Sequence, residues 1–334
     1  MTKHSKLTFL LTLLVSASLS LLVLAGPISV RATADYFRAS TGQEQKQGQT
    51  GRIQTIQFES KLVGKTLPYR VVLPVDYEQP SAKAKHYPVL YLLHGFSGHY
   101  DNWTTKTKLA DYAAQYSMII VTPEGNDGWY IDSATVPTDK YETYILEELI
   151  PDVQRRYRAV DKREGRAIAG LSMGGYGALK FGFKHPEMFA FAGSLSGAIS
   201  AATWGEKELS PGPIRESLLQ TFGPANSPAR VANDVPRLAM EFSAALLPKP
   251  PAPGPDDRSP AKKKSAPPYL YIDCGTEDFL FKDNRDFVRL LVELKIPHEY
   301  RQLPGTHNWK YWDTQVQEVL RIASRIFHSC SANC

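Results

Sequence analysis

The strongest constraint on the fold is a series of short apolar runs separated by segments with helical patterning. Continuous apolar runs of this length are typical of parallel strands that are buried on both faces. The runs are "PVLYLLHG" (88–95), "MIIVTP" (118–123), "GRAIAGLS" (165–172), "FAFAGSLSG" (189–197) and "PYLYIDCG" (268–275). Helical patterning covers about 106–115, 141–157, 174–184, 283–294 and 310–327. The alternation predicts an α/β fold: a mostly parallel central sheet with helices on both faces.

Two further features extend this sheet. The early segments "IQTIQFES" (53–60) and "PYRVVLP" (68–74) have the composition of strands, and "HEYRQLPG" (298–305) predicts a last strand. We therefore expect residues 53–329 to form a single folded domain, preceded by a flexible leader at 35–52 and followed by a short tail at 330–334.

The first 34 residues have the pattern of an export signal. Lys3 and Lys6 precede an apolar stretch over 7–25, and the small residues Ala32 and Ala34 occupy the positions that a signal peptidase reads. This predicts cleavage near Ala34 and a secreted or periplasmic protein. An apolar stretch of this length could also span a bilayer, so an uncleaved membrane anchor is the alternative.

One internal stretch interrupts the alternation. Residues 246–268 read "LLPKPPAPGPDDRSPAKKKSAPP", in which proline and charge exclude a helix or a central strand. We interpret it as a surface insertion within the same domain, and a linker between two domains is the competing reading. The lysines at 262–264 lie in this stretch and are expected to be solvated.

Charge and cysteine content exclude several classes of protein. The formal charge of +5 falls to 5 − 3 = +2 when residues 1–34, with Lys3, Lys6 and Arg31 and no acid, are removed. That balance does not indicate a nucleic-acid-binding protein. Cys330 and Cys334 are close enough in sequence to form a disulfide, whereas a buried, free Cys274 is expected. No spacing of cysteines or histidines indicates a metal site.

The stretch Gly170-Leu171-Ser172-Met173-Gly174 contains the first candidate catalytic residue. A serine between such glycines can sit on a sharp strand-to-helix turn with its hydroxyl exposed at the edge of the sheet. The pattern alone is weak, because chance produces it in roughly one chain of this size in ten. Here it falls between a predicted buried strand and a predicted helix, so Ser172 is a candidate nucleophile and a tight turn is the alternative.

A serine nucleophile needs a base and an acid that orients the base. In hydrolases with this turn the chain order is serine, acid, histidine, with each residue after a strand. Asp278 follows one strand and His307 the next, on the edge where Ser172 is expected. Glu277 is the second candidate for the acid, and Asp273 a third that we expect to lie within its strand.

Hydrolysis of an ester also needs two N–H donors for the oxyanion. The amide of Met173 at the start of the helix is one candidate. The loop "LLHGFSGHYDNW" (92–103) supplies the other, because Gly95 allows the chain to turn and leaves the amide of Phe96 in place. We expect His94 to support this loop rather than to react.

With "LLHGFSG", "GLSMGGYGALK", "CGTEDFL" and "GTHNWKYW" in this order, the chain resembles the esterase D family of α/β hydrolases over about 55–327. That family includes S-formylglutathione hydrolases, feruloyl and acetyl xylan esterases, short-chain carboxylesterases and mycolyltransferases. The stretches 102–130 and 148–177 are most similar to the short-chain carboxylesterases. The resemblance implies an α/β-hydrolase fold, no cofactor, and the roles given above for Ser172, Asp278, His307, Phe96 and Met173.

We therefore expect a serine carboxylesterase that acts on short-chain or sugar-linked esters through an acyl-serine intermediate. An acyltransferase of the mycolyltransferase type and a feruloyl or acetyl xylan esterase are the alternatives, and a non-catalytic binding protein is a remote one. Four aromatic residues lie in loops next to the predicted site: Trp103, Trp129, Tyr130 and Trp309. They either line the pocket or pack the loops, and Trp103 and Trp309 are our candidates for substrate binding.

Overall fold

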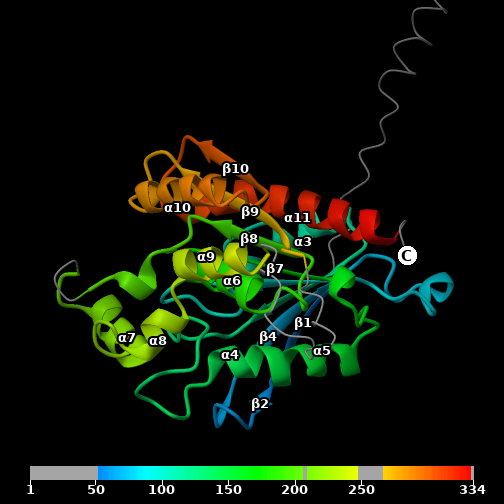
Figure 1. Cartoon of the computed structure of the whole chain (residues 1–334). Helices are drawn as coiled ribbons and strands as arrows, with labels where there is room; N and C mark the ends of the chain where they lie inside the picture. Colours follow the sequence, from blue (N-terminus) through cyan, green and yellow to red (C-terminus); the bar gives the residue numbers. More distant parts are fainter. Residues whose placement is uncertain (1–51, 206–208, 247–265, 332–334) are drawn as a thin grey trace, which may run out of the picture. The chain divides into compact units, whose positions relative to one another are not determined.

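The computed structural model describes residues 52–205, 209–246 and 266–331 (Figure 1). All of them belong to one compact unit, Gly48–Cys334. The predicted signal (1–34), nearly all of the leader (35–52), most of the insertion (246–268) and most of the tail (330–334) lie outside the described residues, as does the proposed Cys330–Cys334 pair. Those interpretations therefore stay predictions.

A mixed sheet of eight strands forms the centre of the domain, in the order β1-β4-β6-β5-β7-β8-β9-β10. The pairs β1/β4 and β4/β6 are antiparallel, and the remaining pairs are parallel. The strands are β1 (Arg52–Ile56), β4 (Tyr69–Leu73), β5 (Val89–Leu93), β6 (Ile119–Pro123), β7 (Arg166–Leu171), β8 (Phe191–Leu195), β9 (Tyr269–Gly275) and β10 (His298–Leu303). The α/β prediction is confirmed, as is the mostly parallel sheet. A small hairpin of β2 (Glu59–Ser60) and β3 (Lys65–Thr66) stands apart from the main sheet.

The helices cover both faces of the sheet (Figure 1). They are α2 (Asn102–Thr105), α3 (Leu109–Ala113), α4 (Tyr141–Thr143), the π-helical turn η2 (Tyr144–Leu149), α5 (Ile150–Arg156), α6 (Met173–Lys184), α7 (Pro213–Phe222), α8 (Pro228–Ala232), α9 (Val235–Leu246), α10 (Phe281–Glu293) and α11 (Trp309–Ser331). In the part of the chain that the structure describes, three short 3₁₀ turns complete the elements: η1 (Pro80–Ala82), η3 (Arg163–Gly165) and η4 (Ala201–Thr203).

Two hydrophobic cores result, one on each face of the sheet. Tyr91 and Leu93 of β5 pack into the core that α5, α6, α9 and α10 cover, whereas Leu90 and Leu92 pack into the core under α3 and α11. Successive side chains of a strand point to opposite faces, so a strand buried on both faces must be apolar at every position. This is why the apolar runs in the sequence were continuous rather than alternating.

Two helices differ from the sequence prediction. The helix expected over 106–115 is shorter and begins at Leu109. The Thr107 hydroxyl donates a hydrogen bond to the Trp103 carbonyl and accepts one from the Leu109 amide. These bonds separate the new helix from the turn before it. The helix expected over 141–157 is present but widens into the π-helical turn η2 before Pro151. Proline lacks an N–H and its ring clashes with the carbonyl four residues earlier, which a wider turn relieves.

No helix among the described residues is long and apolar enough to cross a membrane. The buried Cys274 in β9 is a free thiol, as expected.

Candidate active site

Ser172 occupies a strained turn between β7 and α6. Its backbone has φ 52° and ψ −116°, a conformation that L-residues rarely adopt. A Cβ on Gly170 would lie 2.5 Å from the carbonyl carbon of Gly174, so only glycine fits where the strand folds back on the helix. The turn is further held by the Ser172 amide, which donates to the Leu195 carbonyl at 2.9 Å. The hydroxyl is left half-buried at the end of the parallel strands, where the sequence predicted it.

His307 and Asp278 complete a hydrogen-bonded chain with this serine. The distance from His307 Nε2 to Ser172 Oγ is 3.0 Å, and that from His307 Nδ1 to Asp278 Oδ2 is 2.8 Å. Asp278 lies in the loop after β9 and His307 in the loop after β10. Because β7, β8, β9 and β10 are parallel, their carboxyl ends meet at one edge, and residues distant in sequence come together there.

The two loops are fastened to each other. The Thr276 amide donates to the Leu303 carbonyl at 2.9 Å, and the Glu277 amide to the Gly305 carbonyl at 3.0 Å. A Cβ on Gly275 would lie 2.2 Å from the Gly305 carbonyl oxygen, so the close approach needs glycine at 275. The acid and histidine loops are therefore tied directly to each other, which fixes the geometry of the pair.

The surroundings of Asp278 keep it ionised. Burial alone would raise its pKa, but hydrogen bonds from His307, from the Leu280 amide at 2.8 Å and from the Ser196 hydroxyl lower it below the ordinary value. A carboxylate in this state holds the imidazole proton on Nδ1 and leaves Nε2 free to accept a proton from Ser172.

The other two acid candidates have different roles. Glu277 is exposed, and its carboxylate accepts hydrogen bonds from the Gly305 amide and the Thr276 hydroxyl, so it braces the loops instead of facing His307. Asp273 is fully buried within β9, as expected, and accepts the Tyr271 hydroxyl at 3.0 Å. Burial raises the pKa of Asp273 to about 7.

The predicted oxyanion donors lie on two segments that touch. Gly174, in the first turn of α6, packs so tightly on the end of β5 that a Cβ there would lie 2.6 Å from the Leu93 and His94 carbonyl oxygens. A Cβ on Gly95 would lie 3.3 Å from the Ser172 Cβ. The amide of Met173 belongs to the first turn of its helix, where N–H groups have no intrahelical acceptor. It and the amide of Phe96, which follows Gly95, are therefore both next to Ser172.

His94 supports the second donor. His94 Nδ1 lies 2.8 Å from the Gly95 carbonyl oxygen, and Nε2 lies 2.9 Å from the Gly125 amide nitrogen and 3.3 Å from Glu124 Oε1. The ring therefore ties the Gly95 carbonyl to the segment of Glu124 and Gly125. In a trans peptide the C=O and N–H point in opposite directions. The Gly95 carbonyl and the Phe96 N–H belong to the same peptide group. Because the carbonyl points toward the buried His94 ring, the Phe96 N–H points away from that ring.

A pocket of about 500 Å³ opens at Ser172 and His307. Its lining is largely apolar, with Phe96, Leu171, Ile214, Phe279, Trp309 and Trp312 among its residues. Trp309 lines it, as the sequence suggested. The expectation for Trp103 is wrong: this side chain is fully buried, donates its indole N–H to the Leu93 carbonyl at 3.0 Å and packs edge-on beneath Trp309.

Trp129 and Tyr130 are also buried and pack the loop behind Phe96. Their rings meet other aromatic rings or His94 and do not line this pocket. The structure therefore supports the second alternative for these two residues: they pack the loops.

Sequence reasoning missed three residues around His307. The ring of Phe279, which is 75% exposed, lies 4.6 Å from the imidazole, and the ring of Trp312 meets it edge-on at 4.9 Å. The Trp312 indole donates to the Ser196 hydroxyl at 3.3 Å. Phe279 and Trp312 stand within the "CGTEDFL" and "GTHNWKYW" motifs, so their proximity to Asp278 and His307 was the available signal. No pattern in the sequence indicated a role for Ser196.

Within the described ranges, no group of three or more His, Cys, Asp or Glu side chains is arranged to hold a metal ion.

The sheet order and the serine on its strand-to-helix turn define the α/β-hydrolase fold. The side chains that converge on that turn place the protein among the serine hydrolases of this fold. The chain belongs to the Esterase family, described as "Putative esterase", whose model matches residues 60–239.

Known proteins of similar sequence and structure agree with this assignment. An acetyl esterase of Caldicellulosiruptor saccharolyticus is 26% identical over 281 residues, which cover 82% of this chain and 98% of that protein. The substrate-bound structure of the fluorophosphonate-binding serine hydrolase FphF of Staphylococcus aureus has a TM-score of 0.70 at 26% identity and covers 82% of this chain and 99% of its own. A solved ferulic acid esterase has a TM-score of 0.66 at 28% identity, with coverage of 83% and 99%.

These likenesses confirm the resemblance to the esterase D family. The protein is an enzyme that acts on carboxylic ester bonds.

Proposed function

We propose that this enzyme is a serine carboxylesterase that hydrolyses short-chain or sugar-linked esters through an acyl-enzyme on Ser172. The observation that carries the proposal is the hydrogen-bonded chain from Asp278 through His307 to Ser172, at 2.8 and 3.0 Å, beside an open pocket. A serine hydroxyl is a weak nucleophile until a base in contact with it removes its proton, and this chain supplies that base.

The reaction runs in two half-reactions. Ser172 Oγ attacks the ester carbonyl carbon while its proton passes to His307 Nε2, and the carbonyl oxygen becomes an oxyanion next to the amides of Phe96 and Met173. The tetrahedral intermediate collapses, the bond to the alcohol oxygen breaks, and His307 gives its proton to the departing alcohol. Water then enters, loses a proton to His307 and attacks the acyl carbon. The bond from that carbon to Ser172 Oγ breaks, His307 returns the proton to Oγ, and the acid is released.

The lining of the pocket supports esters with a modest acyl group. Trp309, Phe279 and Ile214 offer apolar surface to such a group. The names of similar proteins, acetyl esterase and ferulic acid esterase, lie in the same range of substrates.

Labelling and turnover test this proposal together. A fluorophosphonate probe should modify Ser172, and p-nitrophenyl acetate and butyrate should be hydrolysed, while Ser172→Ala should lose both properties. The proposal fails if purified protein neither reacts with the probe nor hydrolyses these esters.

The acceptor of the acyl group is tested by competition. With water as the acceptor, adding a sugar or an alkyl alcohol should leave the free acid as the main product. If an ester of the added alcohol became the main product, the enzyme would be an acyltransferase.

Residues 1–34 support export, because the two lysines, the apolar stretch and Ala32-Thr33-Ala34 match a cleavable signal. We propose a secreted or periplasmic enzyme. Amino-terminal sequencing of the extracellular or periplasmic fraction should find a mature chain that starts at or near Asp35. A full-length chain in the membrane fraction would instead indicate an anchor.

A further inference from the structure

Phe96 lies in the loop of residues 94–100, and side chains hold the two peptide groups that flank it. The Gly95 carbonyl, which shares a peptide group with the Phe96 N–H, lies 2.8 Å from His94 Nδ1. The Ser97 amide, in the next peptide group, donates to Asp127 Oδ1 at 2.6 Å. A peptide group is planar, so fixing the groups on both sides of Phe96 fixes its φ and ψ. The direction of the Phe96 N–H is thereby set.

Glu124 ties the same loop to the segment after β6. Its carboxylate is buried and lies 3.3 Å from His94 Nε2 and 3.2 Å from His99 Nδ1. It also accepts hydrogen bonds from the Tyr100 amide at 3.3 Å and the Asn126 amide at 2.8 Å. Burial alone would raise the pKa of Glu124, but the contacts with His94 and the two backbone amides lower it to about 2. The group is therefore ionised at neutral pH and contacts the loop at both of its ends.

The backbone is strained where these two segments meet. Ser97 has φ 56° and Asn126 has φ 42°, in the left-handed region that residues with a side chain seldom occupy. Such conformations persist only where surrounding contacts hold them, and they cluster at functional sites. Here each strained residue donates its amide to one of the two carboxylates: Ser97 to Asp127 and Asn126 to Glu124.

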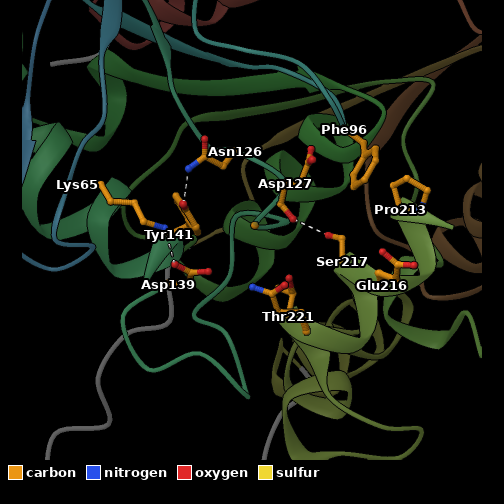
Figure 2. Close-up of a pocket in the computed structure, with 12 residues that line it drawn as sticks. Lys65, Phe96, Asn126, Asp127, Asp139, Tyr141, Pro213, Glu216, Ser217 and Thr221 are labelled. Carbon is orange, nitrogen blue, oxygen red and sulfur yellow. Dashed lines mark hydrogen bonds and ion pairs between the residues drawn. The ribbon is translucent and has the colours of Figure 1, made fainter.

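The segment after β6 is itself anchored to the rest of the domain. Figure 2 shows the Ser217 hydroxyl of α7 donating to the Asp127 carbonyl, at 2.7 Å. It also shows the side-chain amide of Asn126 donating to the Tyr141 hydroxyl, at 2.5 Å. These residues line a second pocket, of about 370 Å³, between α7 and the loop of Asn126 and Asp127. Asp127 is therefore held by α7 on one side and binds the loop of Phe96 on the other.

We propose that Asp127 and Glu124 are positioning residues for ester hydrolysis, which hold the Phe96 N–H in place for the oxyanion. Neither carboxylate lines the catalytic pocket. Asp127 acts through the Ser97 peptide group, and Glu124 acts through His94 and the backbone of the loop. The inference rests on the esterase function and the oxyanion role of the Phe96 amide proposed above. A donor held in advance needs no rearrangement when the negative charge forms, so a loosened donor slows the chemical step and leaves binding of the ester unchanged.

Variants of the two carboxylates test the proposal with p-nitrophenyl acetate. Asp127→Ala removes the acceptor of the Ser97 amide and should lower kcat about tenfold, with KM within about twofold, because complete loss of one oxyanion donor costs about 10²- to 10³-fold. Asp127→Asn keeps an oxygen that accepts this amide, so its kcat should stay within about twofold of wild type. Glu124→Gln leaves one acceptor oxygen in place of two and should lower kcat in the same way as Asp127→Ala, which makes the test independent of any one variant.

Inhibition by butyl trifluoromethyl ketone gives a readout that a merely structural role would not move. Ser172 Oγ adds to the carbonyl carbon of this ketone, the serine proton passes to His307, and the carbonyl oxygen becomes an oxyanion next to the Phe96 amide. The inhibition constant should rise about tenfold in Asp127→Ala, in step with the fall in kcat/KM. The corresponding trifluoromethyl alcohol forms no oxyanion, so its inhibition constant should not change.

Asp139→Ala is the matched control. Asp139 lines the same second pocket as Asp127, but its carboxylate pairs with Lys65 at 3.3 Å and, in the described part of the chain, has no bond to residues 94–100. Its removal should leave kcat, KM and inhibition by the ketone within about twofold of wild type. Circular dichroism and urea unfolding show whether each variant is folded.

The positioning role is overturned if folded Asp127→Ala keeps wild-type kcat and ketone inhibition, or if Asp127→Asn is impaired as strongly as Asp127→Ala. It is also overturned if the ketone and the alcohol lose affinity equally, or if Asp139→Ala shows the same losses, since the effect would then be a general distortion of the pocket. In each of these cases the wild-type enzyme still hydrolyses p-nitrophenyl acetate, and the esterase proposal stands. Absence of that hydrolysis in the wild-type enzyme would remove both proposals.

Discussion

Gly95 lies so close to Ser172 that a Cβ at position 95 would sit 3.3 Å from the Ser172 Cβ. The same Cβ would lie 2.6 Å from Leu171 Cδ1, closer than carbon atoms approach. The loop that carries the Phe96 amide and the turn that carries the serine are thus in direct contact. Their separation is set by the absence of a side chain at Gly95.

We expect Gly95→Ala to push this loop away from the serine. Weakening one oxyanion donor costs about 10²- to 10³-fold in kcat, while KM for p-nitrophenyl butyrate should change little. Steady-state kinetics measure both, and near-ultraviolet circular dichroism checks that the fold is intact. A folded variant with wild-type kcat would show that the Phe96 amide does not act on the oxyanion.

Asp278→Asn tests which acid orients His307. The amide cannot stabilise an imidazolium and favours the wrong tautomer, so kcat should fall by about 10⁴-fold at pH 7. Glu277→Gln is the paired variant, because it keeps an acceptor for the Gly305 amide, and its kcat should fall less than about tenfold. If Glu277→Gln showed the large loss of kcat and Asp278→Asn the small one, the acid would be Glu277.

The raised pKa of Asp273 predicts how the free energy of unfolding depends on pH. Its folded-state pKa of about 7 lies above the ordinary value, so from about pH 4 to pH 7 the folded protein keeps a proton that the unfolded chain releases. The unfolded state then binds fewer protons, and this group makes stability fall as pH rises through that window. Asp273→Asn does not titrate, so its free energy of unfolding relative to wild type should rise by about 2–4 kcal/mol between pH 4.5 and pH 8.

Urea unfolding of both proteins at these two pH values measures the effect. The comparison cancels the contributions of the titrating groups that do not interact with Asp273. Asp111→Asn makes the same substitution at an exposed position of α3 and is the control for the change of side chain itself. A difference between Asp273→Asn and wild type that is the same at both pH values would contradict the prediction.

Trp103 and Trp309, whose rings meet edge to face, should respond differently to truncation. Trp103→Ala removes a fully buried side chain and should lower the free energy of unfolding by about 3–5 kcal/mol. Trp309→Ala removes part of a pocket wall. It should raise KM for p-nitrophenyl butyrate about tenfold with a smaller loss of stability. Thermal unfolding and steady-state kinetics on both variants test the contrast, which fails if Trp103→Ala is as stable as wild type.

The order of elements and the position of the candidate site could be predicted from local patterns. A strand buried on both faces must be apolar throughout, so β5, β6, β7, β8 and β9 were visible as runs of letters. Parallel strands share one carboxyl edge, so residues that follow them, such as Ser172, Asp278 and His307, are brought to one place. This could be predicted without knowing any distance between the three residues.

Sequence alone determined the fold class, the family and the candidate residues of the site, because these depend on patterns along the chain. The tertiary structure decided which of the candidate residues face the site. Asp278 does and the adjacent Glu277 does not, and Trp309 does whereas Trp103 is buried behind it. Adjacent residues differ in direction only once their loops are packed, here through contacts such as that between Gly275 and Gly305. The second pocket likewise exists only where α7 meets the loop of Asn126 and Asp127, segments far apart in sequence that no local pattern connects.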